Sequence, residues 1–165
     1  MTRIHRYTCE LGWTGSTAGG FQHYGREHRA SCPPSPAGLR LSSDPAFLGD
    51  SELLNPEQLL LTAASSCQML SFLAHASRAG LDVIAYSDHA DAVMPEDDKP
   101  VRITRIALRP RITVVGETDD SRVRRCIERA HQTCFIANSL KSEIEIEPQI
   151  ELAESAVKND IPPIS

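Results

Sequence analysis

The sequence has few aromatic residues and no excess of positive charge. Aromatic residues make up 5% of the chain, the formal net charge is -5 and the pI is about 5.7. Few rings are therefore available to stack on bases, and an acidic surface does not attract a nucleic-acid backbone, which favours a basic one. We expect no nucleic-acid partner.

The sequence also lacks the usual signals for passage to or through a membrane. The N-terminus does not show the basic stretch followed by an apolar stretch that marks a secretory signal. We further expect no apolar stretch as long as a membrane-spanning helix. Together these observations predict no membrane partner and a cytoplasmic location.

Closely spaced cysteine pairs are missing as well. The chain has no C-x-x-C motif, which argues against a zinc ribbon and a thioredoxin-type motif. An odd number of irregularly spaced cysteines does not resemble a secreted disulfide framework. In a reducing compartment, a disulfide is more often transient and catalytic than structural. The five cysteines are Cys9, Cys32, Cys67, Cys126 and Cys134.

The remaining composition is that of an ordinary globular protein. The 165 residues are 41% apolar and 24% charged, which is enough chain for one hydrophobic core. We expect a single domain over residues 1–165, with a loosely held tail from about residue 155.

The order of predicted elements favours the α+β class. Strands, a long helix, more strands, a second helix and a final strand follow one another without βαβ regularity. The phase of the fifth strand slips near Pro110. The predicted strands cover residues 7–13, 21–29, 39–41, 81–86, 101–115 and 142–147, with loops over 32–38 and 94–100.

A long helix is predicted from residue 56 to residue 79. Asn55 is a good N-cap, Pro56 suits the first turn, and Glu57 interacts favourably with the helix dipole. Gly80 suits the left-handed conformation that ends many helices. The helix is uncharged around most of its circumference, which is typical of a buried central helix or an oligomer interface.

A second helix is predicted to open at residues 119–121. Its inner stripe contains Val123, Cys126, Ile127 and Ala130, so we interpret Cys126 as a packed side chain. Cys9 lies in a strand and Cys32 in a proline-rich loop, and nothing near them in the sequence indicates chemistry.

Cys67 and Cys134 are the candidates for redox chemistry. A peroxide-reducing cysteine reacts as the thiolate, which a neighbouring arginine stabilises, and a carboxylate can hold that arginine in place. A second thiol then converts the resulting sulfenic acid into a disulfide. Cys67, an arginine, Glu57 and Cys134 would complete this set. The alternative is that Cys67 is a small packed side chain, as most cysteines inside helices are.

Helix geometry limits how Glu57 and Cys67 can share a site. Ten residues separate them, which is about 15 Å along a straight helix. A shared site therefore requires a long bridging arginine, a bent helix, or a second subunit that brings its own helix start. Because the helix is apolar nearly all round, we favour a dimer.

Several motifs resemble those of the OsmC/Ohr family of thiol peroxidases, most closely its OsmC-like branch. They occur in the family's order over nearly the whole chain, and the two that contain cysteine are specific. The matching segments are residues 13–15, 24–28, 42–50, 55–60, 65–67, 108–110 and 130–139.

The resemblance implies a peroxidase that reduces organic hydroperoxides to alcohols. It assigns the attacking thiol to Cys67, the resolving thiol to Cys134 and the carboxylate to Glu57. The activating arginine is Arg26, in Tyr-x-Arg-x-His, with Arg29 as the fallback. An external dithiol, on a lipoylated protein or a small thiol, would reduce the Cys67–Cys134 disulfide. The resemblance implies neither a metal nor an organic cofactor.

The resemblance also implies a fold, and at one position this chain departs from the family pattern. The OsmC-like fold is an intertwined homodimer in which antiparallel sheets wrap around two long central helices, with both sites at the interface. Relatives in this branch often carry a histidine directly after the attacking cysteine, whereas this chain has Gln68. A proton-shuttling role at that position is therefore in doubt.

Two other functions are compatible with the sequence. The chain could be a non-catalytic dimeric module whose thiols are present but whose substrate pocket is closed or altered. It could also bind a metal through His131, Cys134 and another histidine, because H-x-x-C can supply two zinc ligands.

Overall fold

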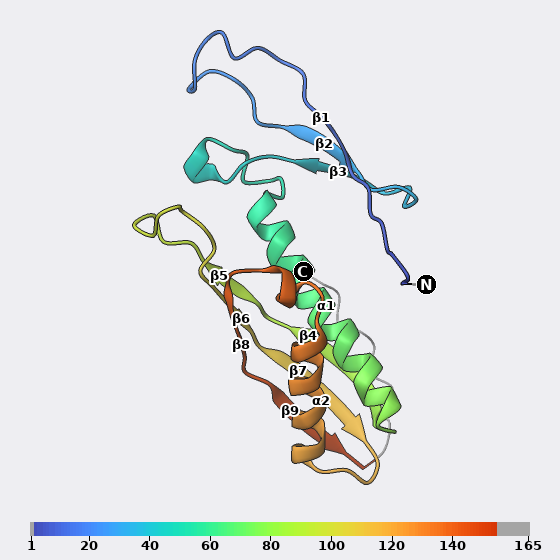
Figure 1. The fold of residues 1–165 in the computed structure, drawn as a ribbon. Helices are drawn as coiled ribbons and strands as arrows, with labels where there is room; N and C mark the ends of the chain where they lie inside the picture. The colour runs from blue at the N-terminus through green and yellow to red at the C-terminus, as the bar shows by residue number, and fades with distance from the viewer. Residues whose placement is uncertain (1, 155–165) are drawn as a thin grey trace. The chain divides into compact units, whose positions relative to one another are not determined.

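The structure is a computed structural model that describes residues 2–154 (Figure 1). The chain forms two compact units, residues 1–60 and 61–165, and the boundary falls inside helix α1 (Pro56–Arg78). Each unit is described by itself below. The single domain over residues 1–165 stays a prediction, and the loose tail predicted from residue 155 lies outside the described residues.

Unit 1 contains an antiparallel sheet in the order β1-β2-β3 (Figure 1). The strands are β1 (Glu10–Gly12), β2 (His28–Ser31) and β3 (Gly38–Leu41). A short 3-10 helix, η1 (Pro45–Phe47), follows and is capped by the Asp44 carboxylate.

The strand predicted over residues 21–29 is wrong for most of its length. Residues 21–24 form a turn and a bend and residues 25–27 are irregular, so β2 begins only at His28. Local hydrogen bonds replace a strand ladder: the His23 N–H donates to the Gly20 carbonyl, and the Arg26 guanidinium donates to the carbonyls of Tyr24 and Phe21. Side-chain bonds to nearby backbone compete with sheet pairing in this way.

Helix α1 begins with a reciprocal cap and ends at a left-handed glycine, as predicted. The Gln58 N–H donates to Asn55 Oδ1 (2.8 Å), and the Asn55 N–H donates to Gln58 Oε1 (3.0 Å). This pair satisfies two N–H groups at the helix start. At the other end Gly80 has φ +70°, and the Leu81 N–H reaches back to the Ala76 carbonyl (2.9 Å). This bond is typical of a Schellman C-cap.

Unit 2 contains two three-stranded sheets, in the orders β4-β7-β9 and β5-β6-β8. The β4–β7 and β5–β6 pairs are antiparallel, whereas the β7–β9 and β6–β8 pairs are parallel. The strands are β4 (Asp82–Asp88), β5 (Asp91–Val93), β6 (Arg105–Leu108), β7 (Pro110–Val115), β8 (Glu143–Ile146) and β9 (Gln149–Ala153).

The parallel pairs correct the expectation of purely antiparallel sheets. Helix α2 (Asp120–Thr133) lies between β7 and β8 in the chain. A helical crossover of this kind returns the chain to the same end of the sheet, so the next strand runs parallel. Strand β9 was not predicted, because Pro148 separates its alternating pattern from that of β8.

Arg109 lies where the strands of unit 2 are interrupted and bonds to residues at the neighbouring strand ends. It separates β6 from β7, where the sequence pattern slips, and its N–H donates to Asp88 Oδ1 (2.7 Å). Its guanidinium pairs with Asp91 and with Glu147 (3.0 Å). Asp88 ends β4, Asp91 begins β5, and Glu147 lies between β8 and β9. Arg109 lies between β6 and β7, and it contacts the interruption between β4 and β5 and the interruption between β8 and β9.

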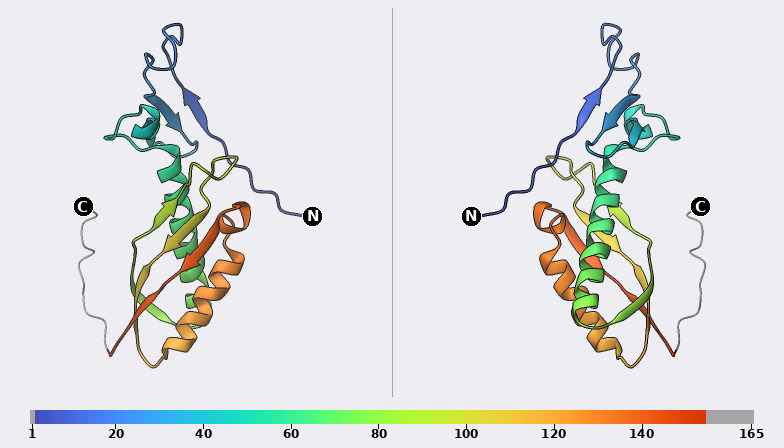
Figure 2. Two further views of the ribbon diagram at one scale, coloured as in Figure 1. Left: turned by 90° about the vertical axis from the view of Figure 1, so that its left-hand side faces the viewer. Right: turned by 90° about the vertical axis from the view of Figure 1, so that its right-hand side faces the viewer.

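The core of unit 2 lies between the two helices and one face of the β4-β7-β9 sheet. Ile112 and Val114 of β7 are fully buried and, two residues apart, point to the same face. The predicted inner stripe of α2 is buried against them. Figures 1 and 2 show α1 and α2 beside each other against the sheet. Helix α1 contributes Ala64, Gln68, Phe72 and Ala76.

The rest of the apolar surface of α1 is left open by the chain itself. Leu70 is 60% exposed, and only 22% of the most apolar window of the helix is buried. By length and composition α1 is the one helix among residues 2–154 that could cross a membrane, with a mean hydropathy of 1.3. The expectation that no apolar stretch is long enough is therefore wrong. We predicted that α1 is either a buried central helix or an oligomer interface. The apolar surface that α1 exposes in the single chain is consistent with an oligomer interface.

Candidate redox site

The structure brings Cys67 and Cys134 together. Cys67 lies in the fourth turn of α1 and is half-buried, and Cys134 is the C-cap of α2 and is 1% exposed. The two thiols are free and lie close enough for Cys67 to raise the pKa of Cys134. Sixty-seven positions along the chain separate them, so the packing of the two helices produces this contact.

The turn after α2 fixes the position of Cys134. The Asn138 side chain donates to the Gln132 carbonyl (3.0 Å) and to the Cys134 carbonyl (2.9 Å), which caps the open end of the helix. The Asn138 N–H also donates to the Cys134 carbonyl (3.0 Å). The Ala137 N–H points at Cys134 Sγ (3.5 Å). The two side-chain bonds explain why an asparagine stands at position 138.

Two side chains of α1 that follow Cys67 connect the helix directly to α2. Gln68 Nε2 donates to the Ile127 carbonyl (3.3 Å), and His75 Nε2 lies 2.9 Å from Thr133 Oγ1. Gln68 is 2% exposed, and among residues 2–154 its Oε1 is one of the buried atoms without a partner. Gln68 therefore faces the other helix, and its observed contact is structural.

Ser65 connects the same stretch of α1 to the sheet. Its hydroxyl lies 2.5 Å from Asp88 Oδ2, and the other oxygen of Asp88 accepts from the Arg109 N–H. Ser65, two residues before Cys67, is thus connected through Asp88 to Arg109, where β6 and β7 are interrupted. The motifs at residues 65–67 and 108–110 are linked through Asp88.

Burial raises the pKa of the Cys134 thiol. The neighbouring Cys67 sulfur raises the pKa of Cys134 further, while the N–H groups of Ala137 and Ile136 act in the opposite direction. The net effect keeps Cys134 protonated, because a buried anion next to a second sulfur is unfavourable.

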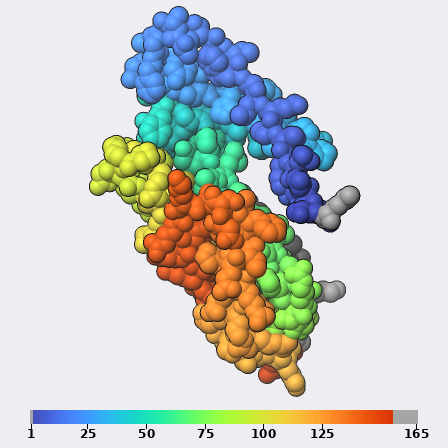
Figure 3. All heavy atoms as spheres, in the orientation of Figure 1, coloured from blue at the N-terminus to red at the C-terminus, as the bar shows by residue number. Residues whose placement is uncertain are grey.

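A groove of about 610 Å³ opens beside Cys67. Its walls come from α1 and from the end of α2, which lie next to each other in Figure 3 (green and orange). Leu70 and Phe135 are 60% and 82% exposed, and two basic side chains stand at the end nearer the helix C-terminus. The lining residues are Ala63, Ser66, Cys67, Leu70, Ser71, Ala74, His75, Arg78, Thr133 and Phe135.

His75 and Arg78 are residues that the sequence analysis missed. Arg78 lies eleven positions after Cys67, close to three helical turns, and His75 lies eight positions after it, about 80° around the helix, so both border the same groove. The positions of these two residues on the helix relative to Cys67 were the signal in the sequence that could have identified them. Arg78 lies about 16 Å further along the axis than Cys67, which is too far to contact the thiol and suits the far end of a bound molecule.

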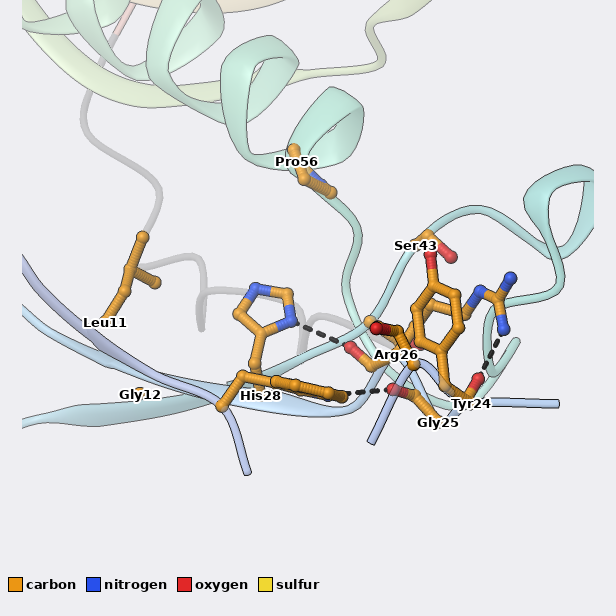
Figure 4. A pocket seen from close by; sticks show the side chains of 11 residues that line it. Leu11, Gly12, Tyr24, Gly25, Arg26, His28, Ser43 and Pro56 are labelled. Carbon is orange, nitrogen blue, oxygen red and sulfur yellow. Dashed lines mark hydrogen bonds between the residues drawn. The ribbon is translucent and has the colours of Figure 1, made fainter. Parts of the chain in front are cut away.

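Arg26 lines a different cavity, of about 580 Å³, within unit 1 (Figure 4). Its guanidinium lies 4.0 Å from the Tyr24 ring centre and 4.7 Å from that of Phe21. Trp13 Nε1 donates to the Gly25 carbonyl (2.8 Å), and His28 Nδ1 lies 2.9 Å from the Arg26 carbonyl. The segment around Arg26 is therefore held by its own residues.

Arg29 and Glu57 occupy other positions in unit 1. Arg29 is exposed on β2 and faces a separate groove, so its environment differs from that of Arg26. Glu57 is half-buried in the first turn of α1, and the ion pairs found among residues 2–154 do not include it. That Arg26 and Glu57 act on Cys67 stays a prediction.

The metal-binding alternative has no donor set in the described part of the chain. Residues 2–154 contain no group of three His, Cys, Asp or Glu side chains that could hold an ion. Cys134 is engaged with Cys67, and His131 Nδ1 is buried without a partner in residues 2–154.

Comparison with known proteins gives a consistent result. A family profile described as OsmC-like protein matches residues 49–149. The peroxiredoxin OsmC of Escherichia coli K12 is 29% identical over 97 residues, which is 59% of this chain and 67% of that protein.

Solved structures are similar over most of the chain. An OsmC-like protein of unknown function from Vibrio cholerae has a TM-score of 0.79 and 25% identity, over 88% of this chain and 100% of that one. An organic hydroperoxide resistance protein from Elizabethkingia anophelis has a TM-score of 0.69 and 16% identity, over 93% and 100%. The second likeness concerns the fold alone.

The raised pKa of Cys134 predicts a loss of stability at alkaline pH. Above the ordinary thiol pKa of about 8.5, the unfolded chain releases the proton while the native state keeps it, so stability falls as pH rises. Cys134→Ser removes this contribution, and the decline between about pH 8 and pH 10 becomes shallower than in the parent protein. Urea midpoints measured under reducing conditions test this. Cys126→Ser, also buried in α2, is the control, and equal slopes for Cys134→Ser and the parent would contradict the prediction.

Proposed function

The chain belongs to the OsmC-like protein family, and from this premise we propose that it is a thiol-dependent peroxidase that reduces organic hydroperoxides to alcohols. The observation that carries the proposal is the closeness of the Cys67 and Cys134 thiols, which interact strongly enough for Cys67 to raise the pKa of Cys134. A pair already in contact can form a disulfide with little movement of the chain.

Cys67 is the attacking thiol in this proposal. It is the more accessible sulfur of the pair, it opens onto the groove, and the raised pKa of Cys134 leaves the other sulfur protonated. The Cys67 thiolate attacks the terminal oxygen of the hydroperoxide. A sulfur–oxygen bond forms, the oxygen–oxygen bond breaks, and the alkoxide takes a proton and leaves as the alcohol.

Cys134 completes the cycle. Its sulfur attacks the sulfur of the Cys67 sulfenic acid, the disulfide forms, and the hydroxyl leaves as water with the Cys134 proton. An external dithiol, on a lipoylated protein or a small thiol, then reduces the disulfide by exchange.

The walls of the groove favour an organic substrate. Ala63, Leu70, Ala74 and Phe135 supply apolar surface beside Cys67, and apolar surface gains from being covered by an alkyl or aryl group. Hydrogen peroxide offers no such group.

Arg26 is the proposed activating cation. A guanidinium carries five N–H donors, and two main-chain carbonyls accept from that of Arg26. The remaining donors are available to a thiolate or a peroxide oxygen, and the ring contacts hold the plane in one orientation. Glu57 would fix the guanidinium from the start of α1.

We further propose that the active form is a cytoplasmic homodimer. The open apolar side of α1 carries Leu70 and the groove beside Cys67, so a second copy covering it would exclude water from the reacting sulfur. The same contact would supply the second helix start that the separation of Glu57 and Cys67 requires.

The cysteine variants test the reaction. Cys67→Ser abolishes consumption of cumene hydroperoxide with a dithiol reductant, because no other thiol occupies the groove. Cys134→Ser allows a single turnover, after which Cys67 oxidises to the sulfinic acid, detected by intact mass. Cys126→Ser retains the parent rate. Full activity without Cys134 but none without Cys126 would reverse the resolving assignment. No turnover by the parent, with Cys67 unreactive, would favour a non-catalytic module.

A charge-conserving pair of variants tests the arginine. Arg26→Lys loses the planar fork, and kcat/KM for cumene hydroperoxide falls about 100-fold, the scale of a lost donor to a developing charge. Arg29→Lys, three residues away on β2, changes it less than about threefold. A larger loss at Arg29 than at Arg26 would exchange the two assignments.

A charge on the open side of α1 tests the dimer. Leu70→Asp weakens self-association at least tenfold, measured by sedimentation equilibrium, because a buried unpaired carboxylate is unfavourable. Leu152→Asp, at a 49% exposed leucine of β9, leaves association unchanged. A monomeric parent at micromolar concentration, or a parent that floats with lipid vesicles, would contradict the homodimer.

A further inference from the structure

Cys9 and Cys32 lie opposite each other where the β1–β2 ladder ends. Glu10 pairs with Ser31 and Leu11 with Ala30, so the next pair in the same register is Cys9 with Cys32. One residue further, Thr8 Oγ1 donates to the Pro33 carbonyl (3.4 Å), so the two chain segments still run side by side there. The sequence interpretation that nothing near either cysteine indicates chemistry is therefore wrong.

The two thiols lie close together. The register places them opposite each other, and the Cys32 side chain interacts with the Cys9 thiol and raises the pKa of Cys9. Directly opposed residues of an antiparallel pair have Cα atoms about 4.5–5.5 Å apart. Disulfides span Cα separations of about 4.4–6.8 Å. The backbone spacing of this pair thus suits a disulfide without rearrangement.

Exposure separates this pair from the pair in unit 2. Cys9 and Cys32 are both exposed, whereas Cys134 is 1% exposed. A small disulfide in solution can therefore reach either sulfur of the first pair. The hydroperoxide chemistry proposed above uses neither Cys9 nor Cys32.

We propose that Cys9 and Cys32 form a second redox pair, which closes to a disulfide by exchange with a small disulfide and reopens with a small thiol. The proposal does not rest on the peroxidase function.

Each exchange step balances. The thiolate of one cysteine attacks a sulfur of the small disulfide, which releases one small thiolate and leaves a mixed disulfide on the protein. The second cysteine, deprotonated, attacks the protein-bound sulfur and displaces the second small thiol. Two protein thiols are oxidised, and one small disulfide is reduced to two thiols.

The pair closes the segment that carries Arg26. Residues 10–31 lie between the two cysteines, and the Trp13–Gly25 hydrogen bond already joins the arms of this segment beside Arg26. A disulfide at its base prevents the arms from separating, because it removes open states from the ensemble. Oxidation of Cys9 and Cys32 therefore stabilises the Arg26 cavity.

Peptide mapping after treatment with excess oxidised glutathione tests the pair. Trypsin places Cys9 in the peptide 7–26 and Cys32 in the peptide 30–40, so the disulfide joins two identifiable peptides. The Cys67→Ser/Cys134→Ser double variant is used beside the parent, so that the other pair does not take part. We expect this cross-link as the main product in both proteins, and its loss in Cys9→Ser.

The competing products are distinguishable. An equal mixture of unlabelled and 15N-labelled protein shows whether the joined peptides come from one chain or from two. Cross-links that combine labelled with unlabelled peptides, one glutathione on each cysteine, or two unreacted thiols would each overturn the proposal. A failed peroxidase assay would not bear on it, since the double variant is inactive by design.

Hydrogen exchange tests the effect on the Arg26 segment. Amides of residues 13–27 should exchange at least threefold more slowly in the oxidised protein than in the reduced one, and Cys32→Ser should show no such difference. Amides of α2, in unit 2, serve as the internal control. Equal exchange of residues 13–27 in both states would overturn the role assigned to the disulfide in stabilising this segment.

Discussion

The packing of α1 against α2 is the constraint on which the candidate site depends. Neither helix alone creates a reactive pair, because the two sulfurs belong to positions far apart in the chain. Gln68 and His75, which follow Cys67 in α1, contact α2, and Ser65, which precedes it, contacts the sheet. Asn138 holds Cys134 at the end of its helix. Buried apolar contacts stabilise the packing of the helices on the sheet, and these polar contacts fix how the helices and the sheet are aligned.

The same packing gives the two thiols different environments. Cys134 is buried and keeps its proton, whereas Cys67 faces a groove with apolar walls. In the proposed reaction, this difference in burial is the reason for assigning the attacking role to Cys67 and the resolving role to Cys134. In unit 1, ring contacts and main-chain carbonyls orient Arg26 before any substrate binds. The proposed mechanism needs such a fixed cation beside the attacking sulfur.

Local signals in the sequence predicted much of this architecture. The Asn55 cap, the Gly80 end of α1 and the inner stripe of α2 follow from short-range chemistry, and the structure confirms them. The family resemblance supplied the pairing of Cys67 with Cys134. The parallel strand pairs were not predicted, because they depend on where the α2 crossover returns the chain.

Other features depend on contacts that no local pattern records. Residues 21–27 alternate like a strand but form a turn, a bend and irregular chain, because the Arg26 guanidinium occupies nearby carbonyls. The contact between Cys9 and Cys32 depends on the β1–β2 register, which the sequence did not specify. Arg78 was overlooked because it is remote from Cys67 in the chain, although helical spacing places both on one groove.

The most direct measurement is a disulfide map of the parent protein after one equivalent of cumene hydroperoxide, without reductant. The account predicts that the peptide 41–78, which contains Cys67, becomes joined to the peptide 130–141, which contains Cys134, with one alcohol formed per disulfide. Cys67 recovered as a free thiol or as a sulfinic acid, with Cys134 unmodified, would contradict it.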